Sequence, residues 1–211
     1  MRFWVVQKKL IQMNLLPQQY NCIGILAKHC DLSKLCIAEN EASNFDLAEL
    51  FCDFWVEIEQ INSEVKAYDD APLPKPEQPT NYTEKKALLD GGNYTDCGGK
   101  LRPFEGIYKI MAYYSYARYV MLNGFNDTPT GLVQKTNEFS IPIDQKALNN
   151  FADKYRNMGL ISFERTQRYI CQNTEIFDYT HCPTGDCGCG SAKCGGTKAK
   201  GYGLRSRNVN K

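Results

Sequence analysis

The 211-residue chain has little histidine, no long hydrophobic run and almost no net charge. No run of roughly 18 apolar residues occurs, so no membrane span is predicted. The 25 basic and 24 acidic residues give a net charge of +1, which excludes a protein that coats nucleic acid with bulk positive charge. The apolar stretch from Phe3 to Val6 is followed directly by Lys8 and Lys9, so no signal peptide is predicted.

Common catalytic motifs are also missing from the sequence. It has no phosphate-binding glycine loop, no G-x-S-x-G and no H-E-x-x-H. Of the two histidines, His29 stands beside Cys30 on a predicted helix, where adjacent side chains point apart and form no dyad. The carboxylates of residues 46–64 follow the pattern of a solvated or subunit-contacting helix face. The sequence therefore predicts no catalytic residue, and an enzyme is the least favoured class.

Charge is strongly separated along the chain. Residues 37–84 contain 12 acidic and two basic residues, whereas residues 182–211 contain six basic and one acidic residue. The neutral total therefore hides an acidic middle segment and a basic C-terminal segment. A subunit polarised in this way is suited to head-to-tail contacts with its neighbours.

Apolar residues at helical spacing predict a mainly α fold, a helical bundle of four to five helices with a long extended loop or hairpin. Helices are expected over 3–16 and 18–37, although two short helices broken at Asp31 fit the second range equally well. The strongest pattern begins at a capping-box-like Ser43–Asp46 and ends at Asp69. Its ~25 residues predict a single rod of about 37 Å with two apolar rows.

Proline and glycine divide the rest of the chain. Four prolines within 72–79 exclude a helix and predict an extended connector. Residues 82–90 are expected to form two helical turns that end at Gly91, before a mobile glycine-rich loop. The predicted regions are the N-terminal helices of the bundle (1–70), a Pro/Gly-rich connector and loop (71–102), the C-terminal helices with the 125–143 loop (103–172), and a flexible Cys/Gly-rich basic tail (173–211).

Two helices are predicted in the C-terminal half. Pro103 opens one that runs to Gly124 and is apolar nearly all round, as in a central or intersubunit helix. Asp144 caps the other, over 145–172. Between them, residues 125–143 are expected to be non-helical, with a turn at Pro129 to Gly131 and an extended segment after it. The inner stripe of the last helix is predicted to hold Leu148, Phe151, Tyr155, Met158 and Ser162, with Arg156, Arg165 and Arg168 outside.

The C-terminal tail has two features with a chemical interpretation. Its four closely spaced cysteines, with His181 alongside, are candidate zinc ligands, although the spacing differs from the common C-x2-C pair. Free thiols or disulfides formed on oxidation are the alternative. Its basic residues are expected either to bind a polyanion or to form a soluble, disordered end. The candidate ligands are Cys182, Cys187, Cys189 and Cys194, and the basic residues include Lys198, Lys200, Arg205 and Arg207.

A pattern over residues 103–172 carries a family resemblance. Its residues are Tyr113, Tyr116, Tyr119, Asn123, Asp127, Thr128, Pro129, Gly131, Val133, Lys135, Thr136, Asn137, Tyr155, Arg156 and Met158. In these residues the chain resembles the head–tail connector, or ring, proteins of crAss-like and related tailed phages of gut Bacteroidetes. The cysteine-rich tail is not part of that pattern, so the zinc hypothesis depends on the cysteine spacing alone.

The resemblance implies a structural virion protein that requires no cofactor. It implies a ring of about twelve copies that joins the portal and capsid to the tail and forms part of the DNA channel. The implied partners are its own copies, the portal protein, neighbouring ring or tail proteins, and genomic DNA that passes without specific binding. The implied location is the virion neck, after synthesis in the host bacterial cytoplasm.

The expected contact residues follow from the same interpretation. They are Tyr113, Tyr116, Tyr119, Asp127, Thr128, Pro129, Lys198, Lys200, Arg205 and Arg207. An acidic face that includes Glu57 and Glu64 is expected to face the lumen and repel DNA. The alternative function is a small zinc-binding adaptor or nucleic-acid-binding protein that acts through the Cys-rich basic tail.

Overall fold

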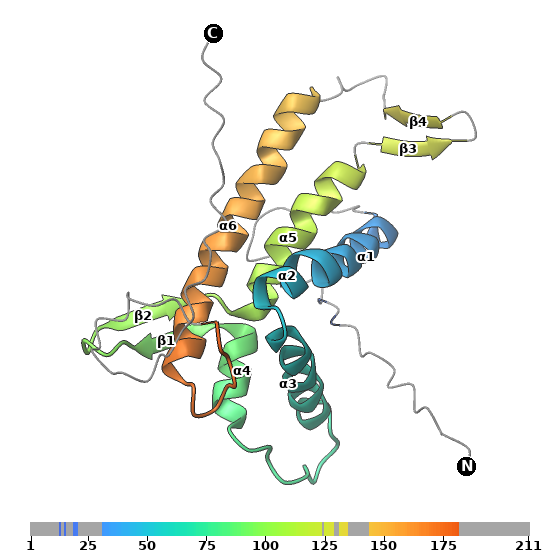
Figure 1. Ribbon diagram of the computed structural model, residues 1–211. Helices are drawn as coiled ribbons and strands as arrows, with labels where there is room; N and C mark the ends of the chain where they lie inside the picture. The colour runs from blue at the N-terminus through green and yellow to red at the C-terminus, as the bar shows by residue number, and fades with distance from the viewer. Residues whose placement is uncertain are drawn as a thin grey trace, which may run out of the picture.

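The computed structural model describes residues 13, 15, 19–20, 31–123, 125–128, 131–134 and 144–181, with the backbone alone for the two short ranges between 125 and 134. Within these residues the fold is mainly α-helical, as predicted, with two small two-stranded sheets (Figure 1). Of the helix predicted over 3–16, only Met13 and Leu15 are described, and neither is assigned to a helix. The tail from residue 182 onward lies outside the described residues.

Two long helices form the centre of the molecule. Helix α5 (Gly106–Asn123) and helix α6 (Gln145–Gln172) run side by side in opposite directions (Figure 1). The central position predicted for α5 is confirmed, because it is buried along most of its length. Helix α6 begins where predicted, since the Asp144 side chain accepts a hydrogen bond of 3.2 Å from the Lys146 N–H. Its 28 residues give a rod of about 42 Å.

The first described helix, α1 (Leu32–Glu41), begins at a capping aspartate. The Asp31 Oδ1 atom accepts hydrogen bonds from the backbone N–H groups of Ser33 and Lys34, at 3.1 and 3.2 Å. These two contacts satisfy N–H groups that have no partner inside the helix. A helix start at Asp31, one of the two alternatives predicted for this region, is therefore confirmed.

The single rod predicted from Ser43 to Asp69 is wrong. The chain continues from α1 through a π-helical segment, η2 (Ala42–Leu47), and the short helix α2 (Ala48–Phe51). It turns at Cys52, which has a φ of 51°, and resumes as α3 (Phe54–Asp69). Ser43 is buried inside η2 and does not cap a helix.

The turn at Cys52 lets aromatic side chains on both sides of it reach the core. Phe51 packs edge-on against Phe163 of α6, with ring centroids 4.9 Å apart. Phe54, on the other side of the turn, packs against Tyr179 at 5.2 Å. Burial of both rings contributes to hydrophobic stabilisation. The second predicted apolar row is buried only in part, since Trp55 is buried but Phe45 is 63% exposed and Cys52 is exposed.

The connector and the helix after it follow the prediction. Residues 71–80 form no helix, and α4 (Tyr82–Asp90) ends at Gly91, which has a φ of 88°. The Asp69 carboxylate, at the end of α3, accepts hydrogen bonds from the Tyr82 hydroxyl and from Lys86 Nζ, the latter at 2.5 Å. These contacts hold the two ends of the connector together.

The loop predicted after α4 is instead a β-hairpin. Strand β1 (Gly92–Thr95) pairs antiparallel with β2 (Leu101–Phe104), and Asp96 closes the turn by accepting a 2.8 Å hydrogen bond from the Lys100 N–H. Pro103, which was predicted to open a helix, lies in β2. The hairpin is fixed to the core by Phe104, which is buried and stacks on Tyr169 of α6 with centroids 4.1 Å apart.

A second hairpin joins α5 to α6. Strand β3 (Phe125–Thr128) pairs antiparallel with β4 (Gly131–Gln134), and Thr128 lies opposite Gly131. This confirms the non-helical prediction for these strand residues. Figure 1 shows the hairpin projecting beside the end of the α5–α6 pair. The predicted turn residue Pro129 lies outside the described residues.

The buried face of α6 differs from the predicted stripe. Ser162 is buried as predicted, but Phe151 and Met158 are exposed, and the small residues Ala152 and Gly159 are buried instead. A methyl group at Gly159 would lie 2.7 Å from the Tyr114 ring, so only glycine permits this close approach. Arg156, Arg165 and Arg168 lie on the outside, as predicted.

Candidate assembly surface

The tyrosines that carry the resemblance gather in one aromatic cluster between α5 and α6. The Tyr116 ring lies 4.7 Å from the Tyr155 ring and 6.3 Å from the Tyr119 ring, centroid to centroid. Tyr113 lies 6.4 Å from Tyr155, and Phe151 lies 5.1 Å from Tyr155. Residues spaced by three along a helix are neighbours on its surface, so Tyr116 lies between Tyr113 and Tyr119 on α5. Tyr155 of α6 packs against Tyr113 and Tyr116.

The cluster has a buried part and an open edge. Tyr113 and Tyr119 are buried within the subunit, and the Tyr119 hydroxyl accepts a 3.1 Å hydrogen bond from the Asp31 N–H. Tyr116 is half-buried, and burial raises the pKa of its hydroxyl, whereas Phe151 is 42% exposed. Tyr113 and Tyr119 therefore hold α5 to its neighbours, and Tyr116 and Phe151 form the accessible edge of the cluster.

An arginine that sequence reasoning missed joins α5 to the N-terminal helices. The Arg118 guanidinium donates hydrogen bonds to both Asp46 carboxylate oxygens, at 2.6 and 3.2 Å, and to Glu41 at 3.0 Å. The pKa of Arg118 is raised above its ordinary value, and the largest cause is the hydrogen bonding to Asp46. The guanidinium also lies 5.6 Å from the Phe45 ring centroid. No sequence pattern pairs Arg118 with acids more than 70 positions away.

The acidic residues expected to face DNA lie on one groove beside α3. Glu57 and Glu64 are two turns apart on the same face and line a groove of about 510 Å³. Burial raises the pKa of Glu57, and the Asp178 charge raises it further. Glu64 is exposed and forms a 2.6 Å ion pair with Lys85 of α4. The pairing and burial reduce the free negative charge at this groove, and its role as a channel face stays a prediction.

A cationic cleft lies on the other side of α6. It has a volume of about 480 Å³ and is lined by Lys100 and Arg102 of the β1–β2 hairpin and by Arg165 and Arg168 of α6. Arg102 is paired with Asp96 at 2.8 Å, and Arg165 with Glu105 at 2.6 Å. Lys100 and Arg168 are the cations of this cleft that have no ion-pair partner among the described residues.

The remaining predicted site residues are placed in part or not at all. Asp127 and Thr128 lie in β3, on the hairpin beside the end of the α5–α6 pair. His181 is exposed, with its ring centroid 5.8 Å from that of Tyr179. The predicted site residues that lie outside the described residues are Pro129, the four proposed zinc ligands Cys182, Cys187, Cys189 and Cys194, and the basic residues Lys198, Lys200, Arg205 and Arg207.

The cysteines of the described residues divide into two states. Cys36 and Cys52 are free and exposed. Cys97, in the turn of the first hairpin, and Cys171, near the end of α6, are disulfide-bonded. No group of three or more potential metal ligands occurs among the described residues. In the same part of the chain, no helix has the length and apolar character needed to cross a membrane.

The fold and surfaces define a mainly α-helical protein with separate acidic and basic grooves. Comparison with known proteins shows the family to which it belongs. Residues 68–188, more than half of the chain, match the family of unknown function DUF6712, and the chain belongs to this family. The match includes α4, both hairpins and the α5–α6 pair. No curated protein and no solved structure matches the chain significantly.

Proposed function

We propose that the chain is a structural subunit of the head–tail connector of a tailed bacteriophage, in a ring that joins the portal and capsid to the tail around the DNA channel. The observation that carries this proposal is the aromatic cluster of α5 and α6. Tyr113, Tyr116, Tyr119 and Tyr155 belong to the pattern in which the chain resembles connector proteins, and their rings lie together in one cluster. The stretch that carries the resemblance, 103–172, also lies wholly within the matched family region.

The shape of the subunit supports the same proposal. Large tyrosine and phenylalanine rings at the open edge of a cluster are frequent in protein–protein contacts. The β3–β4 hairpin projects beside the end of the α5–α6 pair, and Asp127 and Thr128 lie on it (Figure 1). A rigid helix pair with a projecting hairpin provides two contact elements on one subunit, which a closed heterologous ring requires.

Copurification with the portal tests this function. The chain and the portal protein of its parent phage are produced together, and the complex is sized by native mass spectrometry and imaged by electron microscopy. A ring of about a dozen copies on the portal is expected. A monomer that does not bind the portal but binds DNA through residues 182–211 would contradict the proposal and favour the nucleic-acid-binding alternative.

A further inference from the structure

One exposed flank of α6 carries a regular stripe of large side chains. Residues at spacings of three and four form it: Phe151, Lys154, Met158, Ile161, Arg165 and Arg168. Phe151, Met158 and Ile161 are 42%, 37% and 49% exposed. This 3–4 spacing is the pattern of a helix that packs against a partner helix. Large apolar side chains gathered on one exposed flank indicate a contact surface, whereas single exposed ones are ordinary.

The α6 stripe changes from apolar to cationic along its length. Its C-terminal end, Arg165 and Arg168, lines the cationic cleft together with Lys100. Arg165 is paired with Glu105, but Lys154 and Arg168 form no ion pair with the described residues. The surface that fits this stripe therefore combines apolar contact with unpaired negative charge.

The same chain carries a groove that combines apolar contact with negative charge, part of which is unpaired. The groove beside α3 is lined by Asp53, Val56, Glu57, Gln60 and Glu64, together with Ile176 and Lys85. Val56 is 54% exposed, and Asp53 is exposed without an ion pair among the described residues. From Asp53 to Glu64 the groove extends about 16 Å, and from Met158 to Arg168 the stripe extends about 15 Å, at ~1.5 Å per residue.

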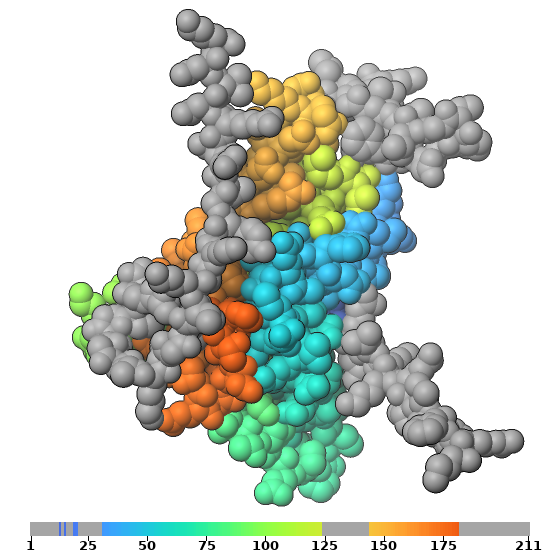
Figure 2. Space-filling model, viewed as in Figure 1, coloured from blue at the N-terminus to red at the C-terminus, as the bar shows by residue number. Residues whose placement is uncertain are grey.

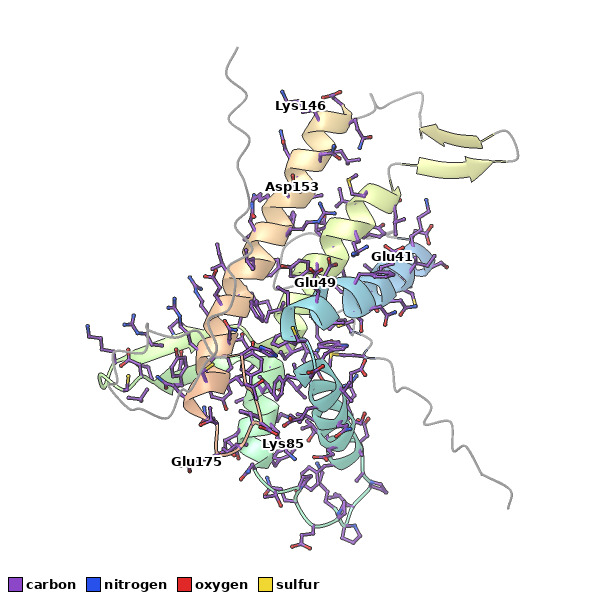
Figure 3. All side chains as sticks on the ribbon, viewed as in Figure 1. Glu41, Glu49, Lys85, Lys146, Asp153 and Glu175 are labelled. Atoms are coloured by element: carbon purple, nitrogen blue, oxygen red, sulfur yellow. The ribbon has the colours of Figure 1, made fainter. Side chains whose placement is uncertain are left out.

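The two surfaces cannot meet within one subunit. The α3 groove contains no α6 residue, and the cationic cleft contains no α3 residue. Figure 3 shows Lys85, at the groove, near the lower end of the molecule, while Asp153 lies on the upper part of α6. Figure 2 shows α1, α2 and α3 forming one continuous surface on the viewer's side. A contact between groove and stripe therefore requires a second copy.

We propose that the α6 stripe of one subunit docks in the α3 groove of the next, with Met158 and Ile161 against Val56 and Arg168 near the groove carboxylates. This contact would hold neighbouring subunits of the proposed ring together, so its biological role rests on the proposed connector function. Because the two surfaces differ, the contact is head-to-tail and generates a ring when the rotation closes. A groove filled in this way cannot also face DNA, so this contact and a lumen role for Glu57 and Glu64 exclude each other.

Photo-crosslinking of the full-length chain tests the contact. A benzoylphenylalanine replaces Ile161, and isotope-labelled and unlabelled copies are mixed so that intermolecular products are recognised by mass. Crosslinks to residues 53–64 of the other copy are expected. The matched control carries the same residue at Ile37, which is 50% exposed on α1 and should give no product in that segment. No intermolecular product from position 161, or products elsewhere, would overturn the proposal.

Charge reversal gives an independent measurement. Arg168→Glu should weaken self-association about tenfold, because it places like charges at the groove. Lys146→Glu, which reverses another exposed cation on α6 outside the stripe, should leave association unchanged. Equal effects of both variants would contradict the contact. If rings form on the portal and are insensitive to Arg168→Glu, the contact is wrong and the connector function stands. If the chain is not a virion component, the function is wrong, whatever position 161 contacts.

Discussion

At the scale of single residues, Arg118 joins three segments of the described structure through its ion pairs. It connects α5 to Asp46 of η2 and Glu41 of α1, in a partly buried site. Removing the guanidinium leaves two carboxylates close together with fewer hydrogen bonds. Losing these hydrogen bonds costs more free energy than losing an exposed ion pair. The two carboxylates stay partly shielded from water but no longer have a charged partner.

We expect Arg118→Ala to lower the free energy of unfolding by about 1.5–3 kcal/mol, the range for hydrogen bonds to charged groups. The measurement is urea denaturation followed by circular dichroism. Arg156→Ala is the matched control, because Arg156 forms an exposed pair with Asp153 on its own helix. The control should cost at most about 0.5 kcal/mol. Equal losses for the two variants would show that Arg118 does not join the elements as described.

A buried carboxyl group predicts how stability changes with pH. Glu39 accepts a 2.5 Å hydrogen bond from the Tyr20 hydroxyl, but its burial has the larger effect and raises its pKa above the ordinary 4.5. The folded state therefore holds this proton more tightly than the unfolded state. The resulting stability is complete below the unfolded pKa and is lost as pH rises through the raised folded pKa.

The variant Glu39→Gln removes the ionisable carboxyl group and keeps a side-chain oxygen that can accept the hydrogen bond from the Tyr20 hydroxyl. Relative to the wild type, we expect the variant to gain stability as pH rises from about 4 to about 8, since only the wild type must ionise a buried group. Urea denaturation at both pH values measures the difference. A difference that stays constant, or shrinks with rising pH, would contradict the assignment.

At the scale of elements, the α5–α6 contact depends on small residues. Gly159 lies where an added methyl group would meet the Tyr114 ring at 2.7 Å. We expect Gly159→Ala to destabilise the protein by about 1–3 kcal/mol through overpacking, although alanine is the better helix former by about 1 kcal/mol. Asn157→Ala, on the exposed side of α6, should be neutral or slightly stabilising. Thermal denaturation of both variants checks this, and a stabilised Gly159→Ala protein would contradict it.

The sequence predicted elements well where local signals were strong. Asp144 and Asp31 carry their own capping signal, and the prolines of 72–79 exclude a helix without reference to the rest of the chain. Prediction failed where distant contacts decide the outcome. The turn at Cys52 exists because Phe51 and Phe54 pack in different directions, and the first hairpin exists because Phe104 stacks on Tyr169.

The candidate surface shows the same division. Periodicity located the apolar residues of α6 but could not say which side meets α5. The helical spacing predicts Phe151 and Met158 on the inner stripe, whereas close packing against the Tyr114 ring selects Gly159 instead. The ion pairs of Arg118 join residues far apart in the sequence, so no local pattern reveals them.

At the scale of the whole molecule, the separation of charge predicts how assembly responds to salt. The proposed contact brings Arg168 near the acidic groove at a partly exposed interface, where ions screen the attraction. We expect self-association to weaken as the ionic strength rises from about 0.05 to about 0.5 M. Ile161→Ala should weaken association at both ionic strengths without removing the salt dependence. Analytical ultracentrifugation measures both, and association that strengthens with salt would contradict a charge-assisted contact.

The most direct test of the connector function is electron cryo-microscopy of the neck of the parent phage particle. The expected result is a ring of copies between the portal and the tail, with density that fits the α5–α6 pair and its β3–β4 hairpin. Purified, infectious particles in which this protein is absent from the neck density and undetectable by mass spectrometry would contradict it.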